Sequence, residues 1–509
     1  MKKNMVIVGG GTAGWLAALA MQKFYGHIYE VTVIESSKIG ILGAGEGTVP
    51  YFIGFLQPIN INVSDLIKHC GATIKNGIKF TNWKNDGTHY YHNFGDMPNA
   101  FTSNVYMNYP FMILDAIQQD VHLDQILVSS KASEKNLIKY SSEFSSDLDL
   151  GTYSLHFNAK LLADYLKRIG IERGVNVIDG IVIDEKLNDN GYITNLTVET
   201  ESDNTQVDVD FLIDSTGFSR KFIKKYDPEW ISYEKYLPVN RALPFFIEMN
   251  EDDDIPPYTE AIAMKYGWIW KIPVEGRYGC GYVFDSSLAT DDEILKEAEE
   301  YFGMKLKSPK TFSFVPGVYR KVWNKNCLAI GLASGFIEPL EATSIWSTAS
   351  LITFMNSCAF EFELNDDAMR NRINVAYYEL NEQILNFVHF HYLSGRNDTE
   401  FWKKFENKNN WPKISKDVYD KTKTKSFMSR IWFKNASHFA MQSWIQIAHG
   451  IGLIDKKLIQ ELFDNLKNAM SDEDIQKYLD GGQRYLRDVD NLVNNFESHK
   501  NFLSRVKRS

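Results

Sequence analysis

The sequence predicts an α/β protein with mixed sheets and a helical C-terminal part. A glycine-rich strand–turn–helix–strand unit begins within the first ten residues, and strand-like runs fill residues 195–330. Periodic apolar positions typical of helices continue from about residue 345. A chain of 509 residues is too long for one core. We therefore expect a large α/β domain over residues 1–350, which includes the strand-rich region, and a helical subdomain over residues 351–509.

The first elements have the pattern of a dinucleotide-binding unit. A short apolar strand over residues 5–8 precedes Gly9-x-Gly11-x-x-Gly14, a helix follows, and a second apolar strand ends at Glu35, 21 residues after Gly14. Glycines let the backbone approach a pyrophosphate at the helix N-terminus, and the acid holds the ribose hydroxyls. A glycine-rich turn without a nucleotide is the alternative. The residues we expect to bind the nucleotide are Gly9, Gly11, Thr12, Ala13, Gly14 and Glu35.

The run Gly-Trp-Ile-Trp-Lys-Ile-Pro over residues 267–273 is rare, because tryptophan is scarce. Strand alternation places Trp268 and Trp270 on one face. We expect Pro273 to end the strand, because proline cannot donate to a ladder. By itself the pattern fits two core tryptophans equally well.

Composition excludes several classes of protein. The net charge is −10, and no dense basic run precedes the C-terminal tail, which argues against a nucleic-acid partner. No signal peptide and no apolar run of membrane-spanning length is found, so we expect a cytoplasmic protein. His389 and His391 are two positions apart on an expected helix and face different ways, so no metal site is predicted. The cysteines have no CxxC spacing and predict neither disulfides nor a zinc site: Cys70, Cys280, Cys327 and Cys358.

Several further motifs resemble those of the flavin-dependent tryptophan halogenases, in the same order along the chain. They are Gly43-Ala44-Gly45-Glu46-Gly47-Thr48-Val49-Pro50, Lys79-Phe80-Thr81-Asn82-Trp83, Tyr91-His92-Asn93-Phe94-Gly95, His156-Phe157-Asn158-Ala159, the tryptophan motif, Phe336-Ile337-Glu338-Pro339-Leu340-Glu341-Ala342-Thr343, and Arg396-Asn397-Asp398-Thr399-Glu400-Phe401-Trp402. The resemblance implies a flavin monooxygenase-like FAD-binding fold with an α-helical C-terminal subdomain.

Two stretches are similar to flavin-holding segments of the wider monooxygenase superfamily, Asp214-Ser215-Thr216-Gly217 and Leu328-Ala329-Ile330-Gly331. That superfamily usually carries an aspartate after the last glycine. Leu332 follows here instead, which fits the halogenase branch. The resemblance thus implies further FAD contacts from Gly45, Glu46, Asp214 and Gly331.

The resemblance also implies the chemistry. In that family reduced FAD and O2 convert halide to hypohalous acid, which passes through a tunnel to a lysine beside an aromatic substrate. The lysine matches Lys75, and burial that lowers its pKa would suit the role. Lys79 is the competing candidate, one turn along if this segment is helical. Glu341 matches a carboxylate that orients the halogen species and takes the ring proton, with Glu338 as the alternative.

The halide site of the family matches Thr343 and Ser344, where relatives have a Thr-Gly step. Ala342 stands where relatives usually have serine. Because serine restricts the backbone more than glycine does, we expect an altered halide geometry. Bromide, which is more easily oxidised and less tightly hydrated than chloride, is then the expected better substrate.

The remaining matches concern the substrate. His92 and Phe94 match positions that sandwich an indole, and Trp268 and Trp270 match a wall between flavin and substrate. The family's Tyr-Tyr and acidic segment, which binds the amino-acid part of tryptophan, has no counterpart in residues 431–439. A free indole or another small electron-rich aromatic is therefore the expected substrate.

Two rival interpretations remain open. One is a flavin monooxygenase that hydroxylates an aromatic, and the other is a flavin-binding protein without turnover, against which the presence of Lys75 and Glu341 argues. The chain contains one dinucleotide fingerprint, so the resemblance implies a separate flavin reductase that supplies reduced FAD. The sequence leaves a homo-oligomer open.

Overall fold

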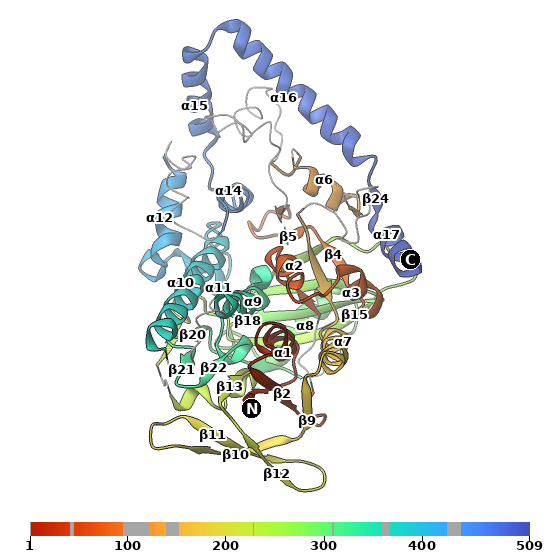
Figure 1. The fold of residues 1–509 in the computed structure, drawn as a ribbon. Coiled ribbons are helices and arrows are strands. Elements are labelled where there is room, and N and C mark those ends of the chain that lie inside the picture. Colours follow the sequence, from red (N-terminus) through yellow and green to blue (C-terminus); the bar gives the residue numbers. More distant parts are fainter. Residues whose placement is uncertain are drawn as a thin grey trace. The chain divides into compact units, whose positions relative to one another are not determined.

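The computed structural model describes residues 2–40, 45–94, 123–125, 127–138, 152–226, 229–307, 310–357, 366–424 and 439–509 (Figure 1). The chain folds into two compact units, each assembled from three stretches. Unit 1 contains Met1–Ala72, His156–Arg241 and Thr311–Ile384, and unit 2 contains Thr73–Leu155, Ala242–Lys310 and Leu385–Ser509. The two compact units therefore do not follow the expected domain boundary at residue 350, and that boundary stays a prediction.

Unit 1 is built on a sheet with the order β21-β22-β13-β1-β2-β9. β1 pairs in parallel with β2 and β13, so Val8 lies beside both Ile34 and Asp214. Helix α1 packs against α7 and α9. The apolar residues of β1 are buried, as a parallel strand covered on both faces requires. The elements are β1 (Lys3–Val8), α1 (Thr12–Tyr25), β2 (Tyr29–Glu35), α7 (Ala159–Glu172), β9 (Asn176–Asp179), β13 (Phe211–Asp214), β21 (Trp323–Asn324), β22 (Cys327–Ala329) and α9 (Thr343–Asn356).

Smaller elements complete unit 1. Strands β10, β11 and β12 form an antiparallel ribbon (Figure 1), and β14, β20 and β23 form another small sheet. β3 pairs with the end of β8. Their bounds are β3 (Glu46–Gly47), α2 (Tyr51–Leu56), α3 (Val63–His69), β8 (Ser154–Phe157), β10 (Ile181–Leu187), β11 (Ile193–Glu199), β12 (Asn204–Asp208), β14 (Trp230–Ser232), β19 (Phe312–Ser313), β20 (Gly317–Tyr319) and β23 (Gly335–Phe336). Short 3₁₀ turns span Gly217–Ser219, Ile223–Lys225, Gly331–Ala333 and Leu340–Ala342.

Unit 2 contains a sheet whose order from β15 onward is β15-β18-β17-β16-β5-β6. β16, β17 and β18 are antiparallel, whereas β5 pairs in parallel with β16. Helix α8 begins with a capping box formed by Thr290 and Glu293, and its buried face packs on this sheet. The elements are β4 (Thr73–Lys75), β5 (Gly77–Thr81), β6 (His89–Asn93), β15 (Arg241–Glu248), β16 (Tyr258–Ala263), β17 (Gly267–Val274), β18 (Arg277–Phe284) and α8 (Asp291–Phe302).

The rest of unit 2 is mainly helical. α14 packs against β6, α16 packs against α6, and the short strand β24 pairs with β7. The bounds are α6 (Val128–Glu134), β7 (Leu137–Ile138), α11 (Glu400–Lys403), α12 (Lys413–Thr422), α14 (Met441–Gly450), α15 (Lys456–Ala469), α16 (Asp472–Val493), β24 (Glu497–Ser498) and α17 (His499–Arg508), with 3₁₀ turns at Leu123–Gln125, Lys404–Glu406 and Lys408–Asn410. Along the chain, α10 (Asp367–His391) begins in unit 1 and ends in unit 2.

The predicted mixed α/β class and the helical C-terminal region are confirmed. One open alternative is excluded, and one local expectation is wrong. Lys75 and Lys79 lie on separate strands, so the helical alternative for this segment does not hold. Pro273 lies inside β17 and does not end it, because pairing with β16 stops at Lys271 and no ladder bond on that side is lost. Within the described residues, no helix is both long enough and apolar enough to cross a membrane.

Candidate functional site

The three glycines of the motif after β1 have different surroundings. A Cβ on Gly9, whose φ is +117°, would lie 2.1 Å from the Ser215 carbonyl oxygen, and one on Gly14 would lie 2.0 Å from the Gly9 oxygen. Both positions therefore need glycine for close backbone packing. A Cβ on Gly11 would meet nothing within 4 Å. The open space at Gly11 is where a ligand can approach the backbone.

The N-terminus of α1 offers unpaired polar groups at this turn. Gly11 is the N-cap, and no side chain caps the helix. The Thr12 hydroxyl is buried and has no hydrogen-bond partner among the described residues. The first N–H groups of a helix and a buried hydroxyl both require partners, and an anion at a helix N-terminus supplies them. These residues fit the pyrophosphate of a dinucleotide such as FAD.

Glu35 lies next to the glycine turn, at the end of β2. Its carboxylate accepts a hydrogen bond of 2.9 Å from Trp15 Nε1 and forms an ion pair with Lys167. A Cβ on Gly10 would lie 1.8 Å from a Glu35 carboxylate oxygen. The structure therefore brings the predicted acid to the turn and holds its side chain there.

Asp214 shapes the loop that follows β13. Its side chain is fully buried and accepts hydrogen bonds from the backbone and hydroxyl of Thr216 and from the backbone N–H groups of Phe222 and Ile223, at 2.6–3.1 Å. Because both carboxylate oxygens are used within the loop, its direct contact with a nucleotide stays a prediction.

Gly331 belongs to the same end of unit 1. Its φ is +60°, and a Cβ there would lie 2.8 Å from the Cβ of Ala13. Glycine is thus required by conformation and by the close approach of this loop to α1. The predicted residues Ala13 and Gly331 are brought together, although they are far apart in the sequence.

The two predicted residues after the first undescribed gap are Gly45 and Glu46. Gly45 has a φ of +90°, and Glu46 starts β3, opposite Phe157 of β8. Burial raises the pKa of the Glu46 carboxyl to about 7, since desolvation disfavours the charged form. Gly43 and Ala44 of this motif lie outside the described residues.

The turn before α9 is conformationally strained. Glu341 and Ala342 have φ values of +66° and +54°, a left-handed conformation that costs about 1–3 kcal/mol for residues other than glycine. Glu341 is buried, and so is Glu338. The strain at Glu341 supports a functional role for this turn, because such conformations concentrate at active sites.

The predicted halide residues begin the helix that follows. Thr343 and Ser344 occupy the first turn of α9, whose N-cap makes no side-chain hydrogen bond. Ser344 adopts ordinary helical backbone angles, since it is not among the residues with positive φ. The restriction expected from replacing glycine by serine at residue 344 therefore does not arise. The left-handed residues are Glu341 and Ala342.

Lys75 is the last residue of β4 and is fully buried. Its Nζ lies 5.2 Å from the centroid of the Phe94 ring, over its face. The Asn76 oxygen accepts the Phe94 N–H at 2.9 Å, which places the start of β5 beside the end of β6. A lysine amine over an aromatic ring gains electrostatic stabilisation from the ring when it is protonated. The structure thus brings the predicted lysine and one predicted substrate residue together.

Lys79 has different surroundings. Its side chain is 16% exposed, and its Nζ lies 3.9 Å from the Glu134 carboxylate. It also lies near the rings of Tyr91 and Tyr258. This lysine has an ion-pair partner in the part of the chain that the structure describes, which makes it a structural cation of the β5 surface.

His92 and Phe94 lie on an aromatic cluster at the end of β6. Their rings are 6.1 Å apart, and His92 also contacts Phe387 at 5.4 Å. The backbone between them is held by Gln446 of α14, whose amide accepts from Asn93 N–H at 2.9 Å and donates to Asn93 oxygen at 3.3 Å. This reciprocal pair of hydrogen bonds holds the backbone of Asn93, the residue between His92 and Phe94.

His389 and His391, considered above as metal ligands, have separate neighbours. His389 Nδ1 lies 2.8 Å from the Ser415 hydroxyl, whereas His391 Nδ1 lies 2.8 Å from the Phe387 carbonyl oxygen. The different partners agree with the expectation that the two rings face different ways on the helix.

Trp268 and Trp270 lie on one face of β17, with ring centroids 6.4 Å apart, as strand alternation predicts. Both side chains are buried. Trp270 is paired with Gly281 of β18, where a Cβ would lie 2.1 Å from the indole. The absent side chain at Gly281 therefore makes room for the Trp270 ring.

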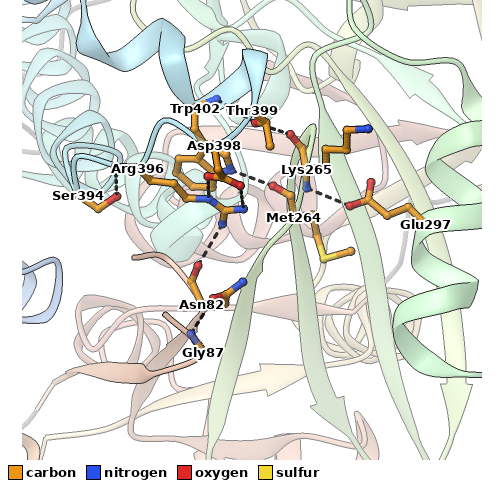
Figure 2. A network of polar contacts seen from close by, with 10 residues as sticks. All are labelled: Asn82, Gly87, Met264, Lys265, Glu297, Ser394, Arg396, Asp398, Thr399 and Trp402. Atoms are coloured by element: carbon orange, nitrogen blue, oxygen red, sulfur yellow. Dashed lines mark hydrogen bonds and ion pairs between the residues drawn. The ribbon is translucent and has the colours of Figure 1, made fainter. Parts of the chain in front are cut away.

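The motif at residues 396–402 braces the strands that carry these residues. Figure 2 shows Arg396, which pairs with the Asp398 carboxylate through two nitrogens and donates to the Asn82 oxygen at 3.1 Å. Trp402 Nε1 donates to the Met264 oxygen at 2.9 Å, and the Thr399 hydroxyl to the Lys265 oxygen at 2.8 Å. The network ties the end of β5 to the turn before β17.

Three residues that hold the backbone beside Lys75 and Phe94 were not predicted from the sequence: Thr73, which bonds to the Pro273 oxygen, His499, which accepts from the Ile74 N–H, and Gln446, which bonds to Asn93. Their roles depend on contacts with residues far along the chain. The reciprocal amide bonds of Gln446 and the glycine opposite Trp270 follow no local spacing. No signal within the sequence of this one chain distinguishes His499 from other histidines.

The βαβ unit with its glycine turn in unit 1, and in unit 2 the buried lysine over an aromatic ring and the paired tryptophans of β17, are the features expected of a flavin-dependent halogenase. The family model described as tryptophan halogenase matches residues 4–467, and the chain belongs to this family. SttH, a tryptophan 6-halogenase from Streptomyces toxytricini, is 30% identical over 427 residues, which cover 79% of this chain and 80% of SttH.

Solved structures agree with this assignment. BrvH, a flavin-dependent halogenase from Brevundimonas sp. BAL3, superposes with a TM-score of 0.86 at 26% identity, covering 99% of each chain. A flavin-dependent halogenase from Xanthomonas campestris superposes with a TM-score of 0.85 at 26% identity, covering 99% of this chain and 98% of its own. The predicted family and enzyme class are confirmed.

Proposed function

We propose that this enzyme brominates or chlorinates a small electron-rich aromatic such as an indole. The reaction uses reduced FAD, O2 and halide, and a separate flavin reductase supplies the reduced FAD. The observation that carries the proposal is the placement of Lys75, which is fully buried with its Nζ 5.2 Å from the Phe94 ring centroid. An amine in such a place can act on a substrate shielded from water.

FAD would be held by residues of unit 1. The open backbone at Gly11, the Thr12 hydroxyl and the α1 N-terminus bind the pyrophosphate, and Glu35 binds the ribose. Gly9, Ala13, Gly14, Gly45, Glu46, Asp214 and Gly331 shape the rest of this site. Reduced FAD bound there would activate O2, and O2 is the oxidant that turns halide into hypohalous acid.

Lys75 then activates the halogen for transfer. Its ammonium group donates a hydrogen bond to the oxygen of hypohalous acid, and a ring carbon attacks the halogen. The carbon–halogen bond forms as the oxygen–halogen bond breaks, and the oxygen leaves as water with a proton from Lys75. Glu341 accepts the ring proton, and the aromatic system is restored. The sum is hypohalous acid and arene in, haloarene and water out, once Glu341 has released its proton to water and Lys75 has regained one from water.

Glu341 is preferred to Glu338 because of its backbone. A left-handed conformation is costly for glutamate and persists only where the surroundings require it. Thr343 and Ser344, in the first turn of α9, offer N–H groups to a halide.

Bromide is the proposed better halide, because it is more easily oxidised and sheds its water more readily. Equimolar bromide and chloride with one substrate test this point. Predominantly brominated product is expected, and predominantly chlorinated product would overturn the preference.

The substrate class rests on the aromatic cluster and on the relatives. SttH is named a tryptophan 6-halogenase and RebH from Lentzea aerocolonigenes a tryptophan 7-halogenase, which supports an indole ring. His92 and Phe94 would stack on the ring. Trp268 and Trp270 would line the tunnel for hypohalous acid. Residues 431–438, where the amino-acid anchor was sought, lie outside the described residues.

The proposal is tested by turnover with FAD, a flavin reductase and NADH. Indole, tryptophan and small phenols are each offered with chloride or bromide, and products are analysed by mass spectrometry. A halogen isotope pattern that disappears in Lys75→Ala and persists in Lys79→Ala is expected. Hydroxylated product would instead assign a monooxygenase, and peroxide alone would assign a flavin-binding protein without turnover.

A further inference from the structure

Lys75 lies on β4, a strand of only three residues at the edge of a small sheet, so few ladder hydrogen bonds are available to it. The structure supplies other contacts. The Thr73 hydroxyl donates to the Pro273 oxygen at 2.7 Å, and the Asn76 N–H donates to the Pro257 oxygen at 2.7 Å. Both contacts lie within unit 2, and they fix the two ends of β4.

The middle of β4 is held by a histidine from the C-terminal helix. The Ile74 N–H donates to Nε2 of His499 at 2.9 Å, and Nδ1 of His499 lies 2.9 Å from the Ile255 oxygen. Because a carbonyl oxygen only accepts, the ring must carry its proton on Nδ1 and accept at Nε2. His499 is fully buried, and burial lowers its pKa to about 4, which keeps the ring in this neutral form.

The position of this bond sets the direction of Lys75. Successive side chains of a strand point to opposite faces, and a slip of one residue would reverse them. Ile74, whose N–H is bound, is the neighbour of Lys75 and is itself fully buried. The bonds at Thr73 and Ile74 together keep the register in which Lys75 meets the Phe94 ring.

We propose that His499 is a positioning residue for Lys75, holding the β4 backbone so that the amine stays over Phe94 and out of solvent. The proposal rests on the proposed role of Lys75 in halogen transfer. His499 starts α17 and lies beyond residues 4–467, the part of the chain that matches the family model. The C-terminal helix is thereby part of the apparatus that serves the reaction.

The test uses two readouts. The first is the rate at which a water-soluble amine reagent labels Lys75, followed by peptide mass spectrometry, with Lys79 as the internal reference. The second is the amount of halogenated product formed per NADH consumed, with a small soluble trap added to capture escaped hypohalous acid. The first readout needs no turnover, so it separates failure of this inference from failure of the proposed function.

His499→Phe removes both hydrogen bonds, and His499→Gln can accept and donate in their place. We expect His499→Phe to raise labelling of Lys75 at least tenfold and to divert oxidant from product to the trap. His499→Gln should restore most of both. Should His499→Phe fail to fold, His499→Asn takes its place, since its shorter amide cannot span both partners.

His389→Phe is the matched control. His389 is also a buried histidine of unit 2, but its described partner is Ser415. The His389→Phe substitution should lower thermal stability without changing the labelling of Lys75 or the yield of product per NADH. Wild-type labelling and yield in His499→Phe would overturn the proposal, and so would the same changes in His389→Phe. Altered labelling in an enzyme that makes no haloarene would retain the positioning role and reject the proposed function.

Discussion

The two compact units position their polar site residues in different ways. In unit 1 the glycine turn, Glu35 and Asp214 lie at the ends of neighbouring parallel strands, where Val8 is in register with Ile34 and Asp214. In unit 2, Lys75 stands on a three-residue strand whose hydrogen-bond partners include Pro273 and His499. These two bonds join residues that are 200 and 425 positions apart.

This difference shows which kind of site can be recognised from the local sequence. Parallel strands bring their carboxyl ends to one edge, so a glycine turn and an acid at the right spacing suffice to indicate a nucleotide site. A lysine braced by distant residues carries no such local signal. Changes at the glycine turn of unit 1 should therefore affect FAD binding, and changes at Lys75 in unit 2 should affect what happens to the halogen.

The largest expected effect separates the two units. Lys75→Met should reduce halogenated product by about 10²–10⁴-fold, the usual contribution of a positioned proton donor. FAD binding, measured by flavin fluorescence, should be unchanged because the predicted FAD residues all belong to unit 1. A variant that loses both product and FAD affinity would contradict this separation.

A fall in pH should change the free energy of unfolding in opposite directions through the buried histidines of unit 2 and through Glu46 of unit 1. Burial lowers the pKa of His389 to about 3 and of His499 to about 4, below the ordinary 6.5. As pH falls from 6.5 towards 4, the unfolded state binds protons that the folded state does not. Each histidine then lowers the free energy of unfolding by about 1.4 kcal/mol per pH unit.

Glu46 opposes this trend, because its pKa is raised to about 7 and its folded form stays protonated between pH 4.5 and 7. It favours folding at the lower end of that window, and this stability is lost as pH rises through 7. Urea unfolding across pH should show a shallower slope in His389→Met and a steeper fall with acid in Glu46→Gln. An unchanged slope in both variants would refute the assigned pKa directions.

The glycine turn of unit 1 permits a matched pair of substitutions. Gly14→Ala should lower the free energy of unfolding by about 1–3 kcal/mol, because its Cβ would lie 2.0 Å from the Gly9 oxygen. Gly11→Ala should leave stability unchanged, since nothing lies within 4 Å, yet weaken FAD binding about tenfold, or about 1.4 kcal/mol. Equal FAD affinity in Gly11→Ala and wild type would argue against ligand approach at this residue.

The smallest expected effect concerns the hydrogen-bond network around Arg396 in unit 2. Arg396→Lys keeps the charge but loses the bidentate pair with Asp398 and the guanidinium contact over the Trp402 ring, so about 1–2 kcal/mol of stability should be lost. Arg168→Lys in unit 1 is the control, because its pair with Glu172 is exposed and worth less than about 0.5 kcal/mol. Thermal unfolding of both variants measures the difference, and equal stabilities would contradict the bracing role of Arg396.

Much of unit 1 could be predicted from the sequence. The strand, glycine turn, helix and acid lie where their pattern placed them, and the contacts of Gly9 and Gly14 explain why glycine is needed. The strand alternation of Trp268 and Trp270 is also confirmed. The pattern failed at Pro273, because pairing on one side of β17 ends before it, and no local signal shows where a neighbouring strand stops.

The sequence alone determined the features that depend on local geometry: helical and strand periodicity, the glycines of the turn, and the motifs that indicate the family. Tertiary structure alone decided that His499 holds Ile74, that Gln446 holds Asn93, and that Glu341 is left-handed. The physical reason is that short-range sterics are set by neighbouring residues, whereas a hydrogen bond across hundreds of residues depends on the register of every element between them.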